Sequence, residues 1–264
     1  MNFTTNKKVG LALSGGGAKG IAHAGVLKHL EEEEIIPTSI AGTSSGAIVA
    51  ALYGWGYSPE DILQFFKSVY FFNWKHFTLK RGGLINSSAF EVYFERIFGD
   101  AVIKDLKIPT YITATDMVNG TLKIFDPDAR IVDAILASTA IPGIISPHII
   151  NSKIYSDGGI LNHFPVDILR DETDFLIGVY VSPLQVVEPD QLKSMRSLTR
   201  RAFNLLSANA DIQKFDLCDW LIEPKELVNY PTFETNKHRM DEIYSIGYDC
   251  AKQQYTEKEH IINH

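Results

Sequence analysis

The chain has 264 residues, a length that suits one large α/β domain or two small ones and can bury a substantial core without metal or disulfides. The formal net charge of -7 argues against nucleic acid as the default partner, and against simple electrostatic adhesion to anionic membranes unless a local basic patch exists. The two cysteines, Cys218 and Cys250, have no spacing typical of a zinc site or a disulfide framework, which fits a reducing compartment.

The N-terminus resembles the start of a signal peptide, because Lys7 and Lys8 precede an apolar run at 9–13. That run is too short for the hydrophobic region of a signal peptide and ends in a glycine loop, so we interpret it as a first strand. No stretch of the sequence approaches the roughly 20 apolar residues that a spanning helix needs. We therefore expect a soluble, cytoplasmic protein that is at most peripheral to membranes.

The first part of the chain alternates short apolar runs with segments of helical spacing, which favours a parallel sheet with helices on its faces. In chain order we expect a strand at 9–14, a glycine loop at 15–17, a helix to about 34, a strand at 39–41, a sharp turn at 42–46 and a helix from 47 to 53. Ser58 and Pro59 are typical of the cap and first position of a further helix.

Later segments indicate that the sheet is mixed. Asn119-Gly120 is a two-residue hairpin signal between two strand-like runs, so part of the sheet should be antiparallel. The remaining predicted elements are helices at 88–98 (ended by Gly99), 130–138, 191–216 and 237–254, and strands at 110–118, 121–125, 149–155, 175–181 and near Leu221. No linker, charge block or internal repeat divides the chain, so we expect a single domain over 1–264, with a motif-bearing core at about 8–181 and a mostly helical part at 182–264.

A first motif lies where the second predicted strand turns into a helix. Residues 42–46 read Gly-Thr-Ser-Ser-Gly and fit G-x-S-x-G, in which Gly42 and Gly46 tolerate a crowded turn that projects Ser44 above the sheet edge. The following helix N-terminus favours negative charge that develops nearby. Ser45 has the same chemistry, but the register of the glycines selects Ser44 as the candidate nucleophile. The alternative is an ordinary small-residue turn.

A second motif follows the first predicted strand. Gly15, Gly16 and Gly17 are followed by Lys19 and Gly20, and such a loop lets backbone N–H groups approach a reacting oxygen closely. Donors held in that way stabilise the oxyanion of acyl transfer. Lys19 adds positive charge there or lies in solvent, and a plain tight strand-to-helix crossing is the simpler interpretation.

The same glycines also satisfy G-x-G-x-x-G, the dinucleotide-binding pattern, so an NAD- or FAD-dependent oxidoreductase is an alternative. That pattern expects an acidic residue at the end of the second strand, where 40–42 read Ile-Ala-Gly. A P-loop also fails, because no G-K-[ST] closes the loop.

A third motif, Asp157-Gly158-Gly159, is on its own most often a plain turn. It becomes informative together with the other two motifs, because a nucleophilic serine needs a base. A carboxylate at a strand end, such as that of Asp157, could reach the same sheet edge.

These three motifs in this order resemble the patatin-like phospholipase family. Residues 15–20 are similar to its oxyanion loop, 42–46 to its nucleophile elbow and 157–159 to its catalytic Asp-Gly-Gly, and 137–143 are similar to a further segment. The resemblance covers about 8–181, and no catalytic position departs from the pattern. Residues after 181 carry no motif that we can place.

The resemblance implies a three-layer α/β/α fold with a mostly parallel, mixed central sheet. It also implies hydrolysis of fatty-acyl esters by a Ser44–Asp157 dyad, with an acyl-enzyme on Ser44 and without histidine, metal or cofactor. A histidine triad is the mechanistic rival, with His163, His148 and His238 as candidates. A weakly basic carboxylate needs help at neutral pH, and partial burial beside an acyl chain would raise the pKa of Asp157.

Aromatic residues crowd 65–77, which we interpret either as an acyl-pocket wall or lid at a lipid surface or as helix core. The expected partners are a lipid or acyl-ester substrate and a transient contact with a membrane surface, and no nucleic acid. His260 and His264 are spaced for a metal on a helix but suit a polar tail better. The substrate-binding residues, the lipid class and the oligomeric state stay open, as does a non-catalytic lipid-binding protein on the same scaffold.

Overall fold

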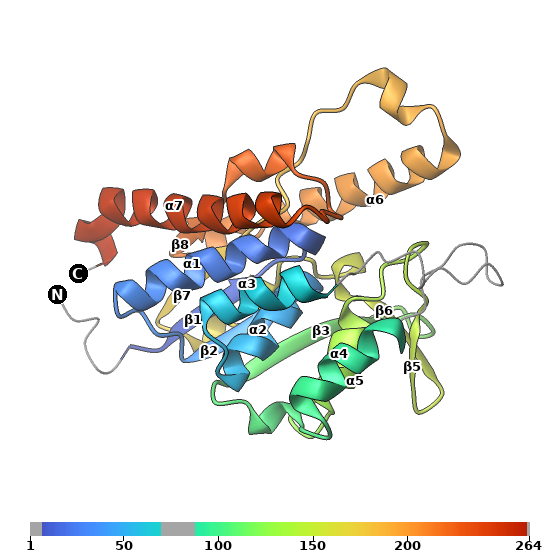
Figure 1. Ribbon diagram of the computed structural model, residues 1–264, viewed down its shortest axis with the longest axis horizontal. Coiled ribbons are helices and arrows are strands. Elements are labelled where there is room, and N and C mark those ends of the chain that lie inside the picture. The colour runs from blue at the N-terminus through green and yellow to red at the C-terminus, as the bar shows by residue number, and fades with distance from the viewer. Residues whose placement is uncertain (1–6, 70–87, 263–264) are drawn as a thin grey trace.

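The computed structural model of the protein describes residues 7–69 and 88–262 (Figure 1). Over these residues the centre is an eight-stranded sheet in the order β5-β6-β3-β2-β1-β7-β8, and β4 pairs with β3 outside that path. The strands are β1 (Val9–Leu13), β2 (Ser39–Gly42), β3 (Thr110–Asp116), β4 (Thr121–Ile124), β5 (His148–Ile150), β6 (Lys153–Asp157), β7 (Phe175–Val179) and β8 (Trp220–Ile222).

The sheet is mixed, as expected. Strands β8, β7, β1, β2 and β3 run parallel, whereas β6 and β4 pair antiparallel with β3, and β5 pairs antiparallel with β6. Gly42 at the end of β2 pairs with Ile112, and Asp157 pairs with Ala114, two residues further along β3. Asp157 at the end of β6 therefore lies level with the turn that follows β2.

The start of α3 and the end of α4 lie at signals that are visible in the sequence. At the start of α3 the Ser58 side chain accepts a hydrogen bond from the Asp61 amide, and the Asp61 side chain accepts one from the Ser58 amide, with Pro59 at the first helical position. Gly99 follows α4 with a φ of 53°. The helices are α1 (Ile21–Glu32), α2 (Ser45–Trp55), α3 (Pro59–Ser68), α4 (Ser88–Phe98), α5 (Ile131–Ser138), α6 (Met195–Ile212) and α7 (Lys237–Ile262).

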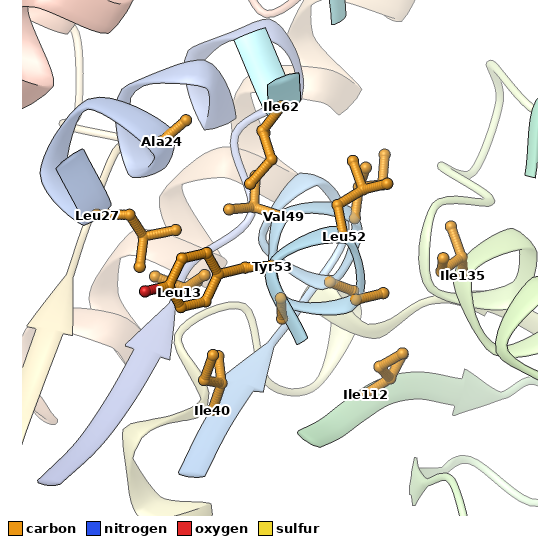
Figure 2. Close-up of a cluster of buried hydrophobic side chains, with 14 of the residues drawn as sticks. Leu13, Ala24, Leu27, Ile40, Val49, Leu52, Tyr53, Ile62, Ile112 and Ile135 are labelled. Atoms are coloured by element: carbon orange, nitrogen blue, oxygen red, sulfur yellow. The ribbon is translucent and has the colours of Figure 1, made fainter. Parts of the chain in front are cut away.

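The two faces of the sheet belong to two hydrophobic clusters. Alternation along β1 places Leu11 and Leu13 in a large cluster with α1, α2, α3, α5 and α7, and places Ala12 in a smaller cluster with Phe164 and Val166. Figure 2 shows Leu13, Ile40 and Ile112 from three strands meeting side chains of the covering helices. The larger face thus carries most of the core, and the fold is the expected α/β fold with a mostly parallel mixed sheet.

Two local predictions were wrong. The predicted strand at 149–155 is a hairpin of β5 and β6, because Asn151 and Ser152 have φ values of 49° and 65° and turn the chain back. The predicted two-residue turn at Asn119-Gly120 is a four-residue loop, since Asp116 pairs with Thr121. Asp116 holds that loop by accepting hydrogen bonds from the amides of Val118 and Asn119.

Helices α1 and α7 lie side by side and approach closely at two glycines (Figure 1). A Cβ on Gly247 would lie 2.1 Å from the Ala22 carbonyl oxygen, and one on Gly25 would lie 2.0 Å from the Tyr244 carbonyl oxygen. Backbone atoms on both sides cannot move aside cheaply, so only glycine allows this packing distance.

We expect Gly247→Ala to lower the free energy of unfolding by about 1–3 kcal/mol through overpacking. Alanine has a higher helix propensity than glycine by about 1 kcal/mol, and this gain offsets only part of the overpacking cost. Chemical denaturation measures it. Ser245→Ala, at an exposed position of the same helix, is the control and should stay within about 0.5 kcal/mol of the wild type. Equal stability of the two variants would contradict the close packing.

Candidate active site

Ser44 occupies a strained position at the junction of β2 and α2. Its φ of 54° and ψ of -123° lie outside the regions that residues with a side chain ordinarily adopt. A Cβ on Gly42 would lie 2.5 Å from the Gly46 carbonyl oxygen, and one on Gly46 would lie 2.3 Å from the Leu13 carbonyl oxygen. The strand–turn–helix context that the sequence predicted is therefore present, and crowding explains both glycines.

Hydrogen bonds from distant segments hold this turn. The Ser44 amide donates to the Ser138 hydroxyl at the end of α5, over 2.8 Å. The Thr43 hydroxyl donates to the Asn162 carbonyl oxygen over 2.8 Å and is 2.7 Å from the Thr113 hydroxyl on β3. All of these side chains are buried, so the turn is fixed by satisfied polar contacts rather than by loop propensity alone.

Asp157 ends β6 and caps the short 3-10 turn that follows it. One carboxylate oxygen accepts a hydrogen bond of 2.7 Å from the Gly159 amide. Its backbone is fixed as well, because its carbonyl accepts from the Thr115 hydroxyl and its amide donates to the Ala140 carbonyl. The side chain is 5 % exposed, the same as that of Ser44.

The structure brings the Asp157 carboxylate and the Ser44 side chain together. Burial raises the pKa of Asp157 above its ordinary value, while a hydrogen bond with the Ser44 side chain and another from the Gly159 amide act in the opposite direction. The net direction is upward, which is what a carboxylate that serves as a proton acceptor near neutral pH requires.

The glycine loop connects β1 to α1 beside this pair. The Gly15 amide donates to the His163 carbonyl oxygen over 3.1 Å, and the Lys19 amide donates to the Gly16 carbonyl oxygen over 3.3 Å. Within the described part of the chain, no protein group accepts a hydrogen bond from the amides of Gly16 or Gly17. Those two N–H groups are the donors left over for a ligand oxygen, and burial lowers the pKa of Lys19 next to them.

An apolar pocket leads away from Ser44. Apart from Ser44, its wall is formed mainly by aliphatic and aromatic side chains of α2, α3, α4, the segment after α5, the segment before α7, and α7 itself. These are Ile48, Phe66, Phe90, Ile141, Ile145, Phe233 and Met240. Phe66 lines the pocket and also belongs to the hydrophobic core. For this residue of the aromatic segment, the pocket-wall and the helix-core interpretations therefore both apply. Residues 70–77 of that segment lie outside the described residues.

His163 lies near the pair but is held by another carboxylate. Its Nδ1 is 2.8 Å from a carboxylate oxygen of Asp211 on α6. A Cβ on Gly15 would lie 2.7 Å from Nε2 of His163 and 3.3 Å from Cβ of Ser44, so the ring is a close neighbour of the turn. Among the described residues, its ring makes no hydrogen bond to Ser44.

The other two candidate histidines lie away from this pair. His148 on β5 pairs with Asp133 on α5 at 3.0 Å, and His238 is exposed in the first turn of α7. Over the described residues no group of three or more metal-ligating side chains is present. None of the described helices is long and apolar enough to cross a bilayer.

The comparison with known families agrees with this geometry. A family model described as patatin-like phospholipase matches residues 11–170, which include all three motifs. The chain belongs to the patatin-like phospholipase family.

Curated relatives of this patatin-like chain are larger proteins. It is 26 % identical over 244 residues to an uncharacterized NTE family protein of Mycobacterium tuberculosis, covering 83 % of this chain and 42 % of that one. It is 28 % identical to lysophospholipase NTE1 of Meyerozyma guilliermondii, covering 96 % of this chain and 19 % of that one. The human patatin-like phospholipase domain-containing protein 6 is 26 % identical over 94 % of this chain and 20 % of its own length. The chain thus spans less than half of these relatives.

Solved structures share the fold at low identity. VipD from Legionella pneumophila superimposes with a TM-score of 0.63 at 15 % identity, covering 95 % of this chain and 67 % of that one. The type III effector protein ExoU superimposes with a TM-score of 0.50 at 15 % identity, covering 97 % and 54 %. These likenesses extend over α6 and α7, the part of the chain that carries no motif.

Two contributors to the patatin-like site were not selected from the sequence. Ser138 lies in the segment that resembles the family, but nothing in its neighbours shows that its hydroxyl accepts from the Ser44 amide. Asp211 lies 48 residues from His163, on helix α6. Contacts between segments so far apart depend on the topology of the sheet, which a single sequence does not reveal.

Proposed function

We propose that the chain is a lipid acyl hydrolase that cleaves fatty-acyl esters through a Ser44–Asp157 dyad and an acyl-enzyme intermediate. The observation that carries the proposal is the interaction of the buried Asp157 carboxylate with the side chain of Ser44, which lines an apolar pocket. A serine needs an adjacent base to become nucleophilic, and a fatty-acyl chain needs an apolar wall.

In the first half-reaction Ser44 Oγ attacks the ester carbonyl carbon and its proton passes to Asp157. The carbonyl oxygen becomes an oxyanion, for which the amides of Gly16 and Gly17 are the available donors. The intermediate then collapses, the alkoxide leaving group takes the proton from Asp157, and the acyl group stays on Ser44. Loss of one such amide donor in an oxyanion hole costs on the order of 10²–10³ in rate.

In the second half-reaction water replaces the alcohol. Asp157 accepts a proton from water as its oxygen attacks the acyl carbonyl, the bond to Ser44 breaks, and Ser44 Oγ recovers its proton. The products are a carboxylic acid and the free enzyme. The same carboxylate thus serves as base and then acid in each half, which favours a pKa above that of an exposed aspartate.

The substrate class follows from the pocket and from the relatives. The apolar lining suits an acyl chain, and among the relatives are one named as a lysophospholipase and one named as a patatin-like phospholipase domain protein. We therefore propose ester-linked lipids as the substrates. The head group and ester position are left to experiment.

A fluorophosphonate probe tests the proposal, because it bonds covalently to an activated serine. We expect one phosphonylated peptide, the one that contains Ser44, and release of fatty acid from at least one member of a panel of phospholipids, lysophospholipids, glycerides and acyl thioesters. Labelling mapped to another serine would reject the assignment of the nucleophile. Labelling of Ser44 without release of fatty acid from any member of the panel would reject the lipid substrate class.

The rival mechanism is a Ser44–His163–Asp211 triad, and His163→Ala distinguishes it. Because Asp157 already contacts Ser44, we expect His163→Ala and Asp211→Asn to keep kcat/KM within about tenfold of the wild type. In a triad, replacing the orienting Asp by Asn costs about 10⁴ in kcat. Hydrolysis of a short-chain ester measures both variants. A loss in His163→Ala as deep as that in Ser44→Ala would replace the dyad by the triad.

A further inference from the structure

The peptide bond between Gly15 and Gly16 has an orientation that steric repulsion alone does not fix. The bond is trans, so its carbonyl oxygen and its N–H point in opposite directions. Glycine lies on both sides of it, and glycine adopts a wide range of backbone angles, so the peptide plane can rotate at little steric cost. Hydrogen bonds to the carbonyl oxygen therefore decide which way the Gly16 N–H points.

The chain that leads into this peptide is held by buried partners. The Ser14 amide donates to the Val179 carbonyl oxygen over 3.1 Å, and the Gly15 amide donates to the His163 carbonyl oxygen over 3.1 Å. Nε2 of the buried His23 lies 2.8 Å from the Ser14 carbonyl oxygen, which can only accept a hydrogen bond. Ser14 and the Gly15 amide are thus fixed, and the Gly15 carbonyl is the next backbone group along the chain.

Two hydroxyls donate to the Gly15 carbonyl oxygen. Ser182, in the segment that follows β7, donates over 2.9 Å, and Ser14 donates over 3.1 Å. Hydrogen bonds between oxygens usually span about 2.5–3.0 Å, so Ser182 is the stronger donor. The Ser14 hydroxyl also accepts from the Val181 amide over 3.0 Å, which holds the two segments together. Ser182 lies beyond residues 11–170, the part of the chain that the family model matches.

The segment that contains Ser182 lies directly against this peptide. A Cβ on Gly16 would lie 3.2 Å from Oγ of Ser182 and 2.7 Å from Cγ2 of Val181. The Gly16 N–H points away from the carbonyl oxygen that Ser182 holds, and among the described residues no protein group accepts from it. The loop also lies against the nucleophile turn, because a Cβ on Gly15 would lie 3.3 Å from Cβ of Ser44.

We infer that Ser182 is a positioning residue for the oxyanion donor. Its hydroxyl holds the Gly15 carbonyl oxygen, so that the Gly16 N–H stays available to the acyl oxygen when Ser44 attacks. This role rests on the proposed hydrolase function. A peptide rotated the other way would present the negative end of the carbonyl dipole to the developing oxyanion in place of a donor. Ser182 acts through the peptide rather than on the substrate, so its loss should slow the chemistry and leave substrate binding nearly unchanged.

Steady-state hydrolysis of a chromogenic fatty-acyl ester by Ser182→Ala tests the inference. We expect kcat to fall by about 10–10²-fold, less than the 10²–10³ of a fully lost donor because Ser14 still holds the carbonyl oxygen in part, and KM to stay within about threefold of the wild type. Ser182→Thr keeps the hydroxyl and should restore kcat to within about threefold. An unchanged kcat in Ser182→Ala, a change in KM alone, or a Ser182→Thr variant as slow as Ser182→Ala would overturn the inference.

Thr38→Val is the matched control. The Val9 carbonyl oxygen at the other end of β1 also accepts from two donors, the Thr38 amide over 2.8 Å and the Thr38 hydroxyl over 3.0 Å, and valine removes only the hydroxyl. Thr38→Val should keep the wild-type kcat, and thermal melting should show all variants folded. A loss of kcat as large as that in Ser182→Ala would assign the effect to the strand rather than to the peptide, and would also overturn the inference.

A crystal structure of Ser182→Ala separates this inference from the proposed function. If the wild type hydrolyses no ester and the fluorophosphonate probe does not label Ser44, the hydrolase function fails, and the orientation of the Gly15–Gly16 peptide decides alone. A peptide that is turned, or present in two orientations, in Ser182→Ala supports its control by Ser182. A peptide that keeps the wild-type orientation overturns that control.

Discussion

Replacing Ser44 with alanine is expected to lower kcat/KM for a fatty-acyl ester by a factor on the order of 10⁴ or more. The variant removes only the hydroxyl, so the pocket, the glycine loop and Asp157 keep their positions. Without a nucleophile no acyl-enzyme forms, and the remaining rate comes from bound water and the oxyanion donors alone. Steady-state hydrolysis of a chromogenic ester and the acyl burst in rapid-mixing experiments measure the loss.

Ser45→Ala is the matched control for this experiment. Ser45 is the adjacent serine, equally buried, and its hydroxyl has no hydrogen-bond partner among the described residues. Alanine there keeps the backbone amide at the start of α2, so we expect kcat/KM within about tenfold of the wild type. If Ser45→Ala lost as much activity as Ser44→Ala, the register of the G-x-S-x-G turn would be misassigned.

The sharp turn that carries the proposed nucleophile was predictable because its determinants are local. A short apolar strand, two glycines and a helix start are adjacent in sequence, and the crowding at Gly42 and Gly46 that the structure shows is what those glycines indicate. The same holds for α3, whose cap and proline are visible at Ser58 and Pro59. Turns and caps of this kind depend on residues that are neighbours in sequence, so the sequence alone predicts them.

The parts that sequence reasoning missed depend on contacts across the fold. A strand pattern at 149–155 cannot show that Asn151 and Ser152 adopt positive φ, because both residues also occur in strands. The partner of His163 is fixed by the path of α6 over the turn after Asp157, and that path is set by tertiary packing.

Asp157→Asn is expected to lower kcat/KM by about 10²–10⁴, the usual contribution of a general acid–base group. Asparagine has nearly the same size and can still accept the hydrogen bond from the Gly159 amide, but it cannot take a proton from Ser44. The loss therefore reports on proton transfer rather than on the shape of the turn. Ester hydrolysis over a range of pH measures it.

The pH dependence provides a second readout of the same residue. Only the ionised carboxylate accepts a proton, so wild-type kcat/KM should rise with pH through the pKa of Asp157, which burial places above the ordinary aspartate value of about 3.9. Asp157→Asn should abolish this limb and leave a low, flat profile. If the acid limb persisted unchanged in Asp157→Asn, the titrating base would be another group, and His163 would be the first to examine.

Stability should change in the opposite direction to activity. A carboxyl with a raised pKa binds more protons in the folded state than in the unfolded state, so its ionisation destabilises the fold as pH rises between the two pKa values. Above both values Asp157→Asn avoids that cost and should melt at a higher temperature than the wild type, whereas at lower pH the difference should vanish. A variant that loses activity while gaining stability cannot be explained by unfolding. Such a result would assign to Asp157 a role in chemistry for which the protein gives up some stability.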